Sequence, residues 1–154
     1  MLTKPIYAVL LGVLLVSCSQ SKHPALAPEY LYNAGDQKVI SSLINNKHHT
    51  ISIIYGNGPA LRSAQDTVRT HTAGEQYVMV TWRQRPMPHW YGTNMNGKIL
   101  AVETVTVAQD PAGKIGYSYL LKNTGGNNTI EPDVSREQRI QLITGQPAAV
   151  LPEN

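Results

Sequence analysis

The segment QYVMVTWRQR, residues 76–85, decides the fold class. Consecutive side chains of an extended strand point to opposite faces. One face of this segment carries Val78, Val80 and Trp82. The other face carries Tyr77, Met79, Thr81 and Arg83. This alternation predicts a β-strand.

Further strands are predicted on both sides of this segment. Residues 98–109 place Ile99, Ala101, Glu103, Val105 and Val107 on one face, and residues 114–122 group Ile115, Tyr117, Tyr119 and Leu121. Two short runs rich in β-branched residues, 38–43 and 49–55, flank the pair Asn45-Asn46, which suits a hairpin turn. The sequence therefore predicts a mostly antiparallel sheet of about five strands.

Two helices complete the prediction. Pro59 suits a first helical turn, and the apolar spacing that follows predicts a helix to about Arg69. A second helix is predicted from Ser135, which with Gln138 forms a capping box, to Thr144, where Gly145 ends it. The predicted fold is α+β, with both helices packed on one face of the sheet.

The N-terminal segment predicts export and a lipid anchor. Residues 6–16 are an apolar run of eleven residues, which suits a signal peptide and is too short to span a bilayer. The sequence Leu15-Val16-Ser17-Cys18 resembles the bacterial lipobox. That resemblance implies acylation of Cys18, and Ser19 implies sorting to the outer membrane. The alternative is an ordinary secretory peptide with a chance cysteine.

These features divide the chain into three parts. Residues 1–17 are the predicted lipoprotein signal peptide, and residues 18–36 are the acylated cysteine and a flexible tether. Residues 37–152 form a single predicted domain. The predicted localisation is a bacterial membrane, with the domain facing the periplasm.

Composition excludes several classes of function. The chain has 13 Lys and Arg against 10 Asp and Glu, without a contiguous basic stripe, so nucleic acid is not an expected partner. Its single cysteine, Cys18, excludes an intrachain disulfide and a Cys-x-x-Cys-His haem attachment site. Thiol redox chemistry is excluded for the same reason.

An ordered set of segments resembles the cytochrome P-460 superfamily. The set comprises Ile53–Asn57 followed by Ala60, Val80–Arg83 followed by Pro88–Gly92, Gly97 leading into Val102-Glu103, and the closing Ala149–Pro152. The resemblance runs from about Gln37 to Pro152. It implies a cytochrome P-460-like fold, and in haem-bearing members an oxidoreductase activity.

The chain departs from the haem-bearing members at the residues that hold the cofactor. Arg139–Ile143 stands where the haem attachment motif would fall, and residues 76–85 contain no lysine for the cross-link to haem. We therefore expect no cofactor and no metal. Ile140, Leu142 and Ile143 are expected to fill the vacated volume, so that added haem binds weakly. The alternative is non-covalent haem, with His89 as axial ligand.

Several residues are candidates for ligand binding: Trp82, Arg83, His89, Trp90, Glu103 and Tyr117. The prolines around His89 and Trp90 fix the backbone and can hold both rings in place. The alternative is that Trp90 covers the core while His89 bonds to the backbone.

Glu103 lies among apolar residues, so it is a candidate general acid or base beside Tyr117 or Arg83. The alternative is an ion pair with an arginine on the next strand. His48, His49 and His71 are expected to be solvated loop residues.

The predicted function is that of an envelope lipoprotein that binds a small ligand or a partner protein. Its membrane contact is the bilayer, through acylated Cys18. Enzymatic activity is not the favoured interpretation, and would be an oxidoreductase of cytochrome P-460 type. Two alternatives remain open, a haem-binding oxidoreductase or sensor and a structural envelope protein without a pocket. A homodimer is compatible with the sequence.

Overall fold

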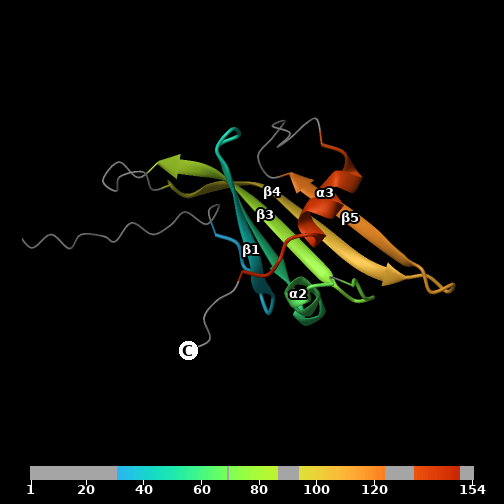
Figure 1. Cartoon of the computed structure of the whole chain (residues 1–154). Coiled ribbons are helices and arrows are strands. Elements are labelled where there is room, and N and C mark those ends of the chain that lie inside the picture. The colour runs from blue at the N-terminus through green and yellow to red at the C-terminus, as the bar shows by residue number, and fades with distance from the viewer. Residues whose placement is uncertain (1–30, 69, 87–93, 124–133, 150–154) are drawn as a thin grey trace, which may run out of the picture.

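The computed structural model describes residues 31–68, 70–86, 94–123 and 134–149. Its elements, in chain order, are β1 (Lys38–Asn45), β2 (Thr50–Gly56), α2 (Gly58–Gln65), β3 (Gln76–Pro86), β4 (Asn94–Gln109), β5 (Ile115–Asn123) and α3 (Arg136–Thr144). The strands form one sheet in the order β1-β2-β3-β4-β5, and all neighbours are antiparallel (Figure 1). The predicted α+β class and five-stranded antiparallel sheet are confirmed.

The strand pairing is regular except at two places. β1 carries an irregularity between Val39 and Ser41, and β3 shifts register against β4 around Trp82. The β1–β2 turn is closed by Asn45, whose Oδ1 accepts a hydrogen bond from the His48 backbone nitrogen at 3.1 Å. β5 pairs with β4 without a shift, from Ile115 to Asn123.

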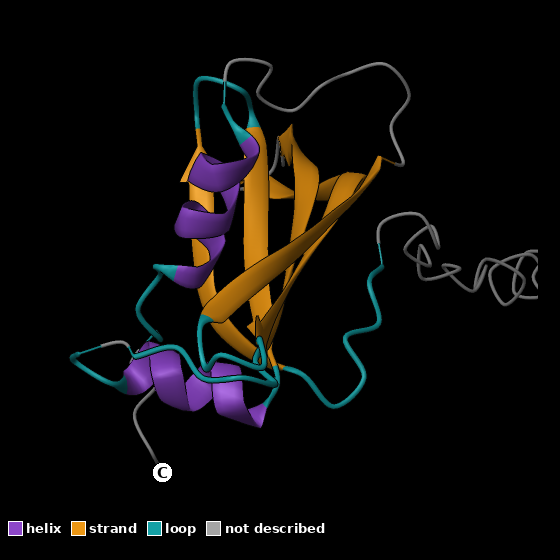
Figure 2. Cartoon of the chain, turned by 90° about the vertical axis from the view of Figure 1, so that its right-hand side faces the viewer, coloured by secondary structure: helices purple, strands orange, loops and turns teal. Residues whose placement is uncertain are grey.

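Each face of the sheet carries its own apolar cluster. On the face that the helices cover, strand residues pack with Ala60 and Ala64 of α2 and Ile143 of α3; these strand residues are Ile40, Ile54, Tyr77, Met79, Val105 and Val107. The opposite face carries Val78, Val80 and Trp82, against which Tyr32 and other partly buried residues pack. Figure 2 shows α3 and the segment that precedes β1 on opposite sides of the sheet.

The helix α2 is shorter than the sequence predicts. It ends at Gln65 rather than near Arg69, because Asp66 takes an extended backbone conformation and its carboxylate accepts a hydrogen bond from the Val68 nitrogen at 3.1 Å. Such side-chain bonds to the backbone compete with helical ones. Val68, which lies within the predicted range of this helix, is 80% exposed.

The start of α2 is fixed by Asn57 and Gly56. The Asn57 Oδ1 accepts hydrogen bonds from the backbone nitrogens of Ala60 and Gln76, both at 3.1 Å, and so caps the helix and ties it to β3. Gly56 has no side chain, and an added Cβ would collide with Ile40 and lie 2.9 Å from the Ala60 Cβ. The glycine therefore allows α2 to approach β1 closely.

The helix α3 has the predicted bounds and the predicted capping box. The Gln138 nitrogen donates to the Ser135 Oγ at 3.2 Å, and the Ser135 nitrogen donates to the Gln138 Oε1 at 2.8 Å. Beyond the helix, the Ala149 nitrogen donates to the Ile40 carbonyl at 2.7 Å. Within the described residues, no helix has the length and apolar character needed to cross a membrane.

Candidate functional site

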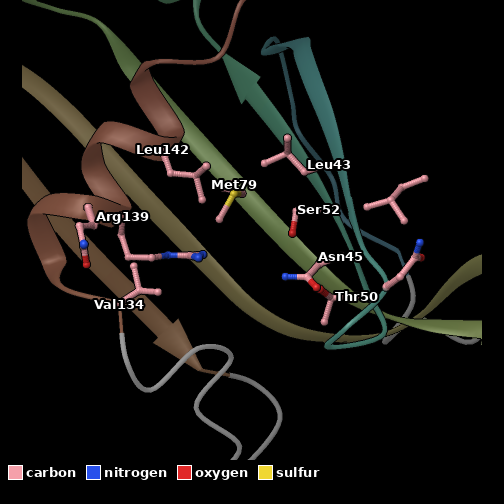
Figure 3. A pocket seen from close by; sticks show the side chains of 11 residues that line it. Leu43, Asn45, Thr50, Ser52, Met79, Val134, Arg139 and Leu142 are labelled. Atoms are coloured by element: carbon pink, nitrogen blue, oxygen red, sulfur yellow. The ribbon is translucent and has the colours of Figure 1, made fainter.

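A groove lies between α3 and the β1–β2 hairpin, and we call it the α3 groove (Figure 3). Its volume is about 570 Å³, within the range of about 300 to 1,000 Å³ that small-molecule pockets occupy. It is lined by Leu43, Ile44, Asn45, Asn46, Thr50, Ser52, Met79, Val134, Gln138, Arg139 and Leu142.

The two parts of the α3 groove differ in polarity. Leu43 and Leu142 lie on either side of Met79, whereas Asn45, Thr50 and Ser52 gather along the hairpin (Figure 3). The Ser52 Oγ is hydrogen-bonded to the Thr81 Oγ1 at 2.9 Å. The groove thus offers an apolar part beside a part that carries hydroxyl and amide groups.

Arg139 is the one charged side chain among the described residues that line the α3 groove, and its charge is neutralised. Its Nε donates to the Glu103 Oε1 at 2.9 Å, and its Nη2 donates to the Glu103 Oε2. The Tyr119 hydroxyl donates to the same Oε1 at 2.7 Å. Burial, followed by the hydrogen bond to the Glu103 carboxylate, raises the pKa of Tyr119, so this hydroxyl stays a donor. The ion pair between Arg139 and Glu103 links α3 to β4.

The structure corrects the expected surroundings of Glu103. The prediction that its side chain is buried is confirmed, with an exposed fraction of 0%. Its partners are Arg139 and Tyr119, rather than Tyr117, Arg83 or an arginine on the next strand. A signal for Arg139 was present in the sequence, because it precedes the buried Ile143 by four residues and so shares its face of the helix.

The other sequence candidates do not assemble into one site. Trp82 is 2% exposed and lies in the cluster on the face of the sheet opposite Glu103. Arg83 is exposed in the C-terminal part of β3. Tyr117 is 39% exposed and lines a different hollow from the α3 groove. Cys18, His89 and Trp90 lie outside the described residues.

A second buried carboxylate, Glu75, lies beside β3 and is 0% exposed. It accepts hydrogen bonds from the Thr72 nitrogen at 2.6 Å, from the His71 Nδ1 at 2.7 Å and from the Tyr77 hydroxyl at 2.9 Å. Burial alone raises the pKa of Glu75, but these hydrogen bonds outweigh burial and hold the pKa below its ordinary value of 4.5. His71 lies in a loop, as predicted, but its side chain is only 18% exposed and is hydrogen-bonded to a buried carboxylate rather than fully solvated.

A second hollow lies on the other flank of α3, and we call it the β5 cleft. Its volume is about 470 Å³, and it is lined by His71, Tyr117, Glu137, Ile140, Gln141, Thr144 and Gly145. Of the three branched residues of α3 that were expected to fill the vacated volume, Ile143 is buried in the core and Ile140 packs against it while partly buried. Leu142 lines the α3 groove, and Ile140 lines the β5 cleft.

Neither hollow presents a cluster of metal ligands. Among the described residues, no group of three or more His, Cys, Asp or Glu side chains is placed to hold a metal ion. No model of a known protein family matches the chain, and a search of curated proteins gives no match. The cytochrome P-460 resemblance therefore stays a prediction.

Proposed function

We propose that this chain is a lipid-anchored bacterial envelope protein that binds a small neutral ligand in the α3 groove, on a cytochrome P-460-like domain without covalent haem. The observation that carries the proposal is the groove itself. It combines a ligand-sized volume with an apolar part and several converging hydroxyl and amide groups.

The charges of the site favour a neutral ligand. The lining side chains include no Asp or Glu, and the guanidinium of Arg139 is already paired with the buried Glu103. A charged ligand would lose its hydration without gaining an ionic partner, which is costly. A neutral molecule with an apolar body and a polar end matches both parts of the groove.

The ligand-binding proposal is tested with a neutral fluorescent probe, N-phenyl-1-naphthylamine, whose emission rises in apolar surroundings. Leu142→Trp places a large side chain in the groove and should weaken probe binding at least about tenfold, equivalent to about 1.4 kcal/mol. The matched control is Leu120→Trp, because Leu120 is 68% exposed on β5 and lies outside the groove. Equal affinities in the two variants would contradict the proposal and favour a structural envelope protein.

The membrane anchor is supported by the lipobox and by the absence of any other cysteine. Two or more acyl chains give stable membrane attachment, whereas one chain gives marginal binding. Mass spectrometry of the protein from its native membrane should show an acylated N-terminal Cys18. A Cys18→Ala variant should leave the membrane fraction, and one that remains there would contradict the anchor.

The proposal contains no catalytic step. Glu103, the candidate general acid or base, is 0% exposed and accepts hydrogen bonds from Arg139 and Tyr119, so it does not face the groove as a free proton carrier. We expect haem titration to give weak binding without saturation. Tight one-to-one binding that His89→Ala abolishes would instead favour the haem-binding alternative.

A further inference from the structure

The imidazole of His71 is held in one orientation by a buried carboxylate. The Glu75 Oε2 lies 2.7 Å from the His71 Nδ1, and Glu75 also accepts hydrogen bonds from Thr72 and Tyr77. An ionised carboxylate only accepts hydrogen bonds, so Nδ1 must carry the proton. In the neutral ring the lone pair is then on Nε2, and a carboxylate partner on one nitrogen strengthens the other as an acceptor.

The Nε2 of His71 has no hydrogen-bond partner among the described residues and is not fully buried. Every buried polar side-chain atom of the described residues has a hydrogen-bond partner. Since Nε2 of His71 has none, it is not one of the buried atoms. The side chain as a whole is 18% exposed, and His71 lines the β5 cleft. Because Nδ1 is bonded to Glu75, Nε2 is the ring nitrogen that remains to accept a hydrogen bond from a molecule in the cleft.

The rest of the β5 cleft favours an uncharged aromatic molecule. The Tyr117 ring stands edge-on to the His71 ring, with centroids 5.8 Å apart at 85°, and Ile140 adds an apolar wall. Two carboxylates, the buried Glu75 and the lining Glu137, disfavour an anion. A charged amine would lose hydration against the apolar walls.

We propose that the β5 cleft is a second binding site, which takes a neutral aromatic molecule carrying one O–H or N–H group that donates to Nε2 of His71. Phenol is the simplest member of this class. The site is independent of the α3 groove, because α3 separates the two hollows. Glu137, Ile140 and Gln141 face the cleft, whereas Gln138 and Leu142 face the groove.

The test compares phenol with anisole, its methyl ether, which has a similar shape but no donor. The full chain in detergent is titrated with each compound, and the imidazole resonances are followed by NMR. We expect phenol to bind about 3- to 10-fold more tightly than anisole, the difference that one net hydrogen bond supplies. The partition of each compound into the micelles is measured without protein, and the free concentrations are corrected for it before phenol and anisole are compared.

Three variants test whether the preference for phenol over anisole depends on His71 and on the β5 cleft. His71→Phe should abolish the preference for phenol, whereas His48→Phe, which changes an exposed histidine of the β1–β2 turn, should keep it. Because His71→Phe also removes a partner of Glu75 and could unfold the chain, Gln141→Trp serves as a second variant. It changes an exposed residue of the cleft and should weaken binding of both compounds.

Several results would overturn the proposal. These are equal binding of phenol and anisole to the wild type, a preference that survives in folded His71→Phe, binding unchanged by Gln141→Trp, and a ¹⁵N spectrum that places the His71 proton on Nε2. None of them bears on the α3 groove, because that site is tested through Leu142, which lines the groove and does not line the β5 cleft.

Discussion

Replacing Arg139 by leucine should destabilise the fold strongly. The substitution removes the two hydrogen bonds that the guanidinium gives to Glu103 and leaves the carboxylate with Tyr119 alone. Each hydrogen bond to a charged group contributes about 1.5 to 3 kcal/mol, so two contribute about 3 to 6 kcal/mol. Breaking a buried ion pair from one side costs about 3 to 5 kcal/mol. We therefore expect a loss of about 3 to 5 kcal/mol.

A loss of this size is a large share of the whole stability, since domains unfold at a cost of about 5 to 15 kcal/mol. It is measured from urea unfolding of the full chain, followed by circular dichroism. The matched control is Arg136→Leu on the same helix, because Arg136 is exposed and its guanidinium carbon lies 5.9 Å from the centroid of the Tyr119 ring. That contact is worth about 0.5 to 1 kcal/mol at an exposed site.

The double variant Glu103→Leu/Arg139→Leu separates the ion pair from simple packing. Replacing both partners of a buried pair by apolar residues is often neutral or stabilising. We expect the double variant to lie closer to wild type than Arg139→Leu does. The reasoning is refuted if Arg139→Leu loses less than about 1 kcal/mol, or if the double variant loses the sum of the two single losses.

Two further predictions concern Glu75 and Gly56. The folded pKa of Glu75 lies below 4.5, so its ionised form stabilises the fold above about that pH, and the contribution disappears as the pH falls through the folded pKa. The stability difference between wild type and Glu75→Gln, measured by urea unfolding, should shrink between neutral pH and about pH 3; a constant difference would contradict the assignment. Gly56→Ala should cost about 1 to 3 kcal/mol by overpacking, because the new Cβ meets Ile40 and Ala60. A thermal midpoint equal to that of the wild type would show that α2 moves away at no cost.

Sequence patterns predicted the sheet well because each strand carries its own periodicity. The faces of residues 76–82 and 101–107 are assigned correctly, since alternation is a local property of a regular strand. Ile99, expected on the face of Glu103, instead packs with Trp82 on the opposite face, because the register shift between Thr81 and Trp82 interrupts the alternation. The capping box at Ser135 is likewise local and is found where it was expected. The end of α2 was misjudged because the Asp66 side chain competes with the next helical turn, an effect that apolar spacing does not register.

The site residues were harder to predict because their roles depend on contacts between distant segments. Burial of Glu103 followed from its apolar neighbours on one strand, but its partner Arg139 lies 36 residues away on a helix. His71 and Glu75 are four residues apart in a segment without regular structure, where no periodicity indicates which side chains meet. The two hollows flank α3, and their existence depends on where that helix lies on the sheet.

The order of the strands in the sheet, which is also their order in the chain, has a consequence for folding. Each strand pairs with its sequence neighbour, so every step of sheet assembly closes a shorter loop than a pairing between distant strands would, and shorter loops cost less entropy to close. The helix α3 comes last, and it must bring Arg139 to Glu103 and Ala149 to Ile40 across long stretches of chain. We therefore expect strand pairing to precede the docking of α3 in the folding pathway. Both hollows, which α3 helps to line, would then form only in the final step.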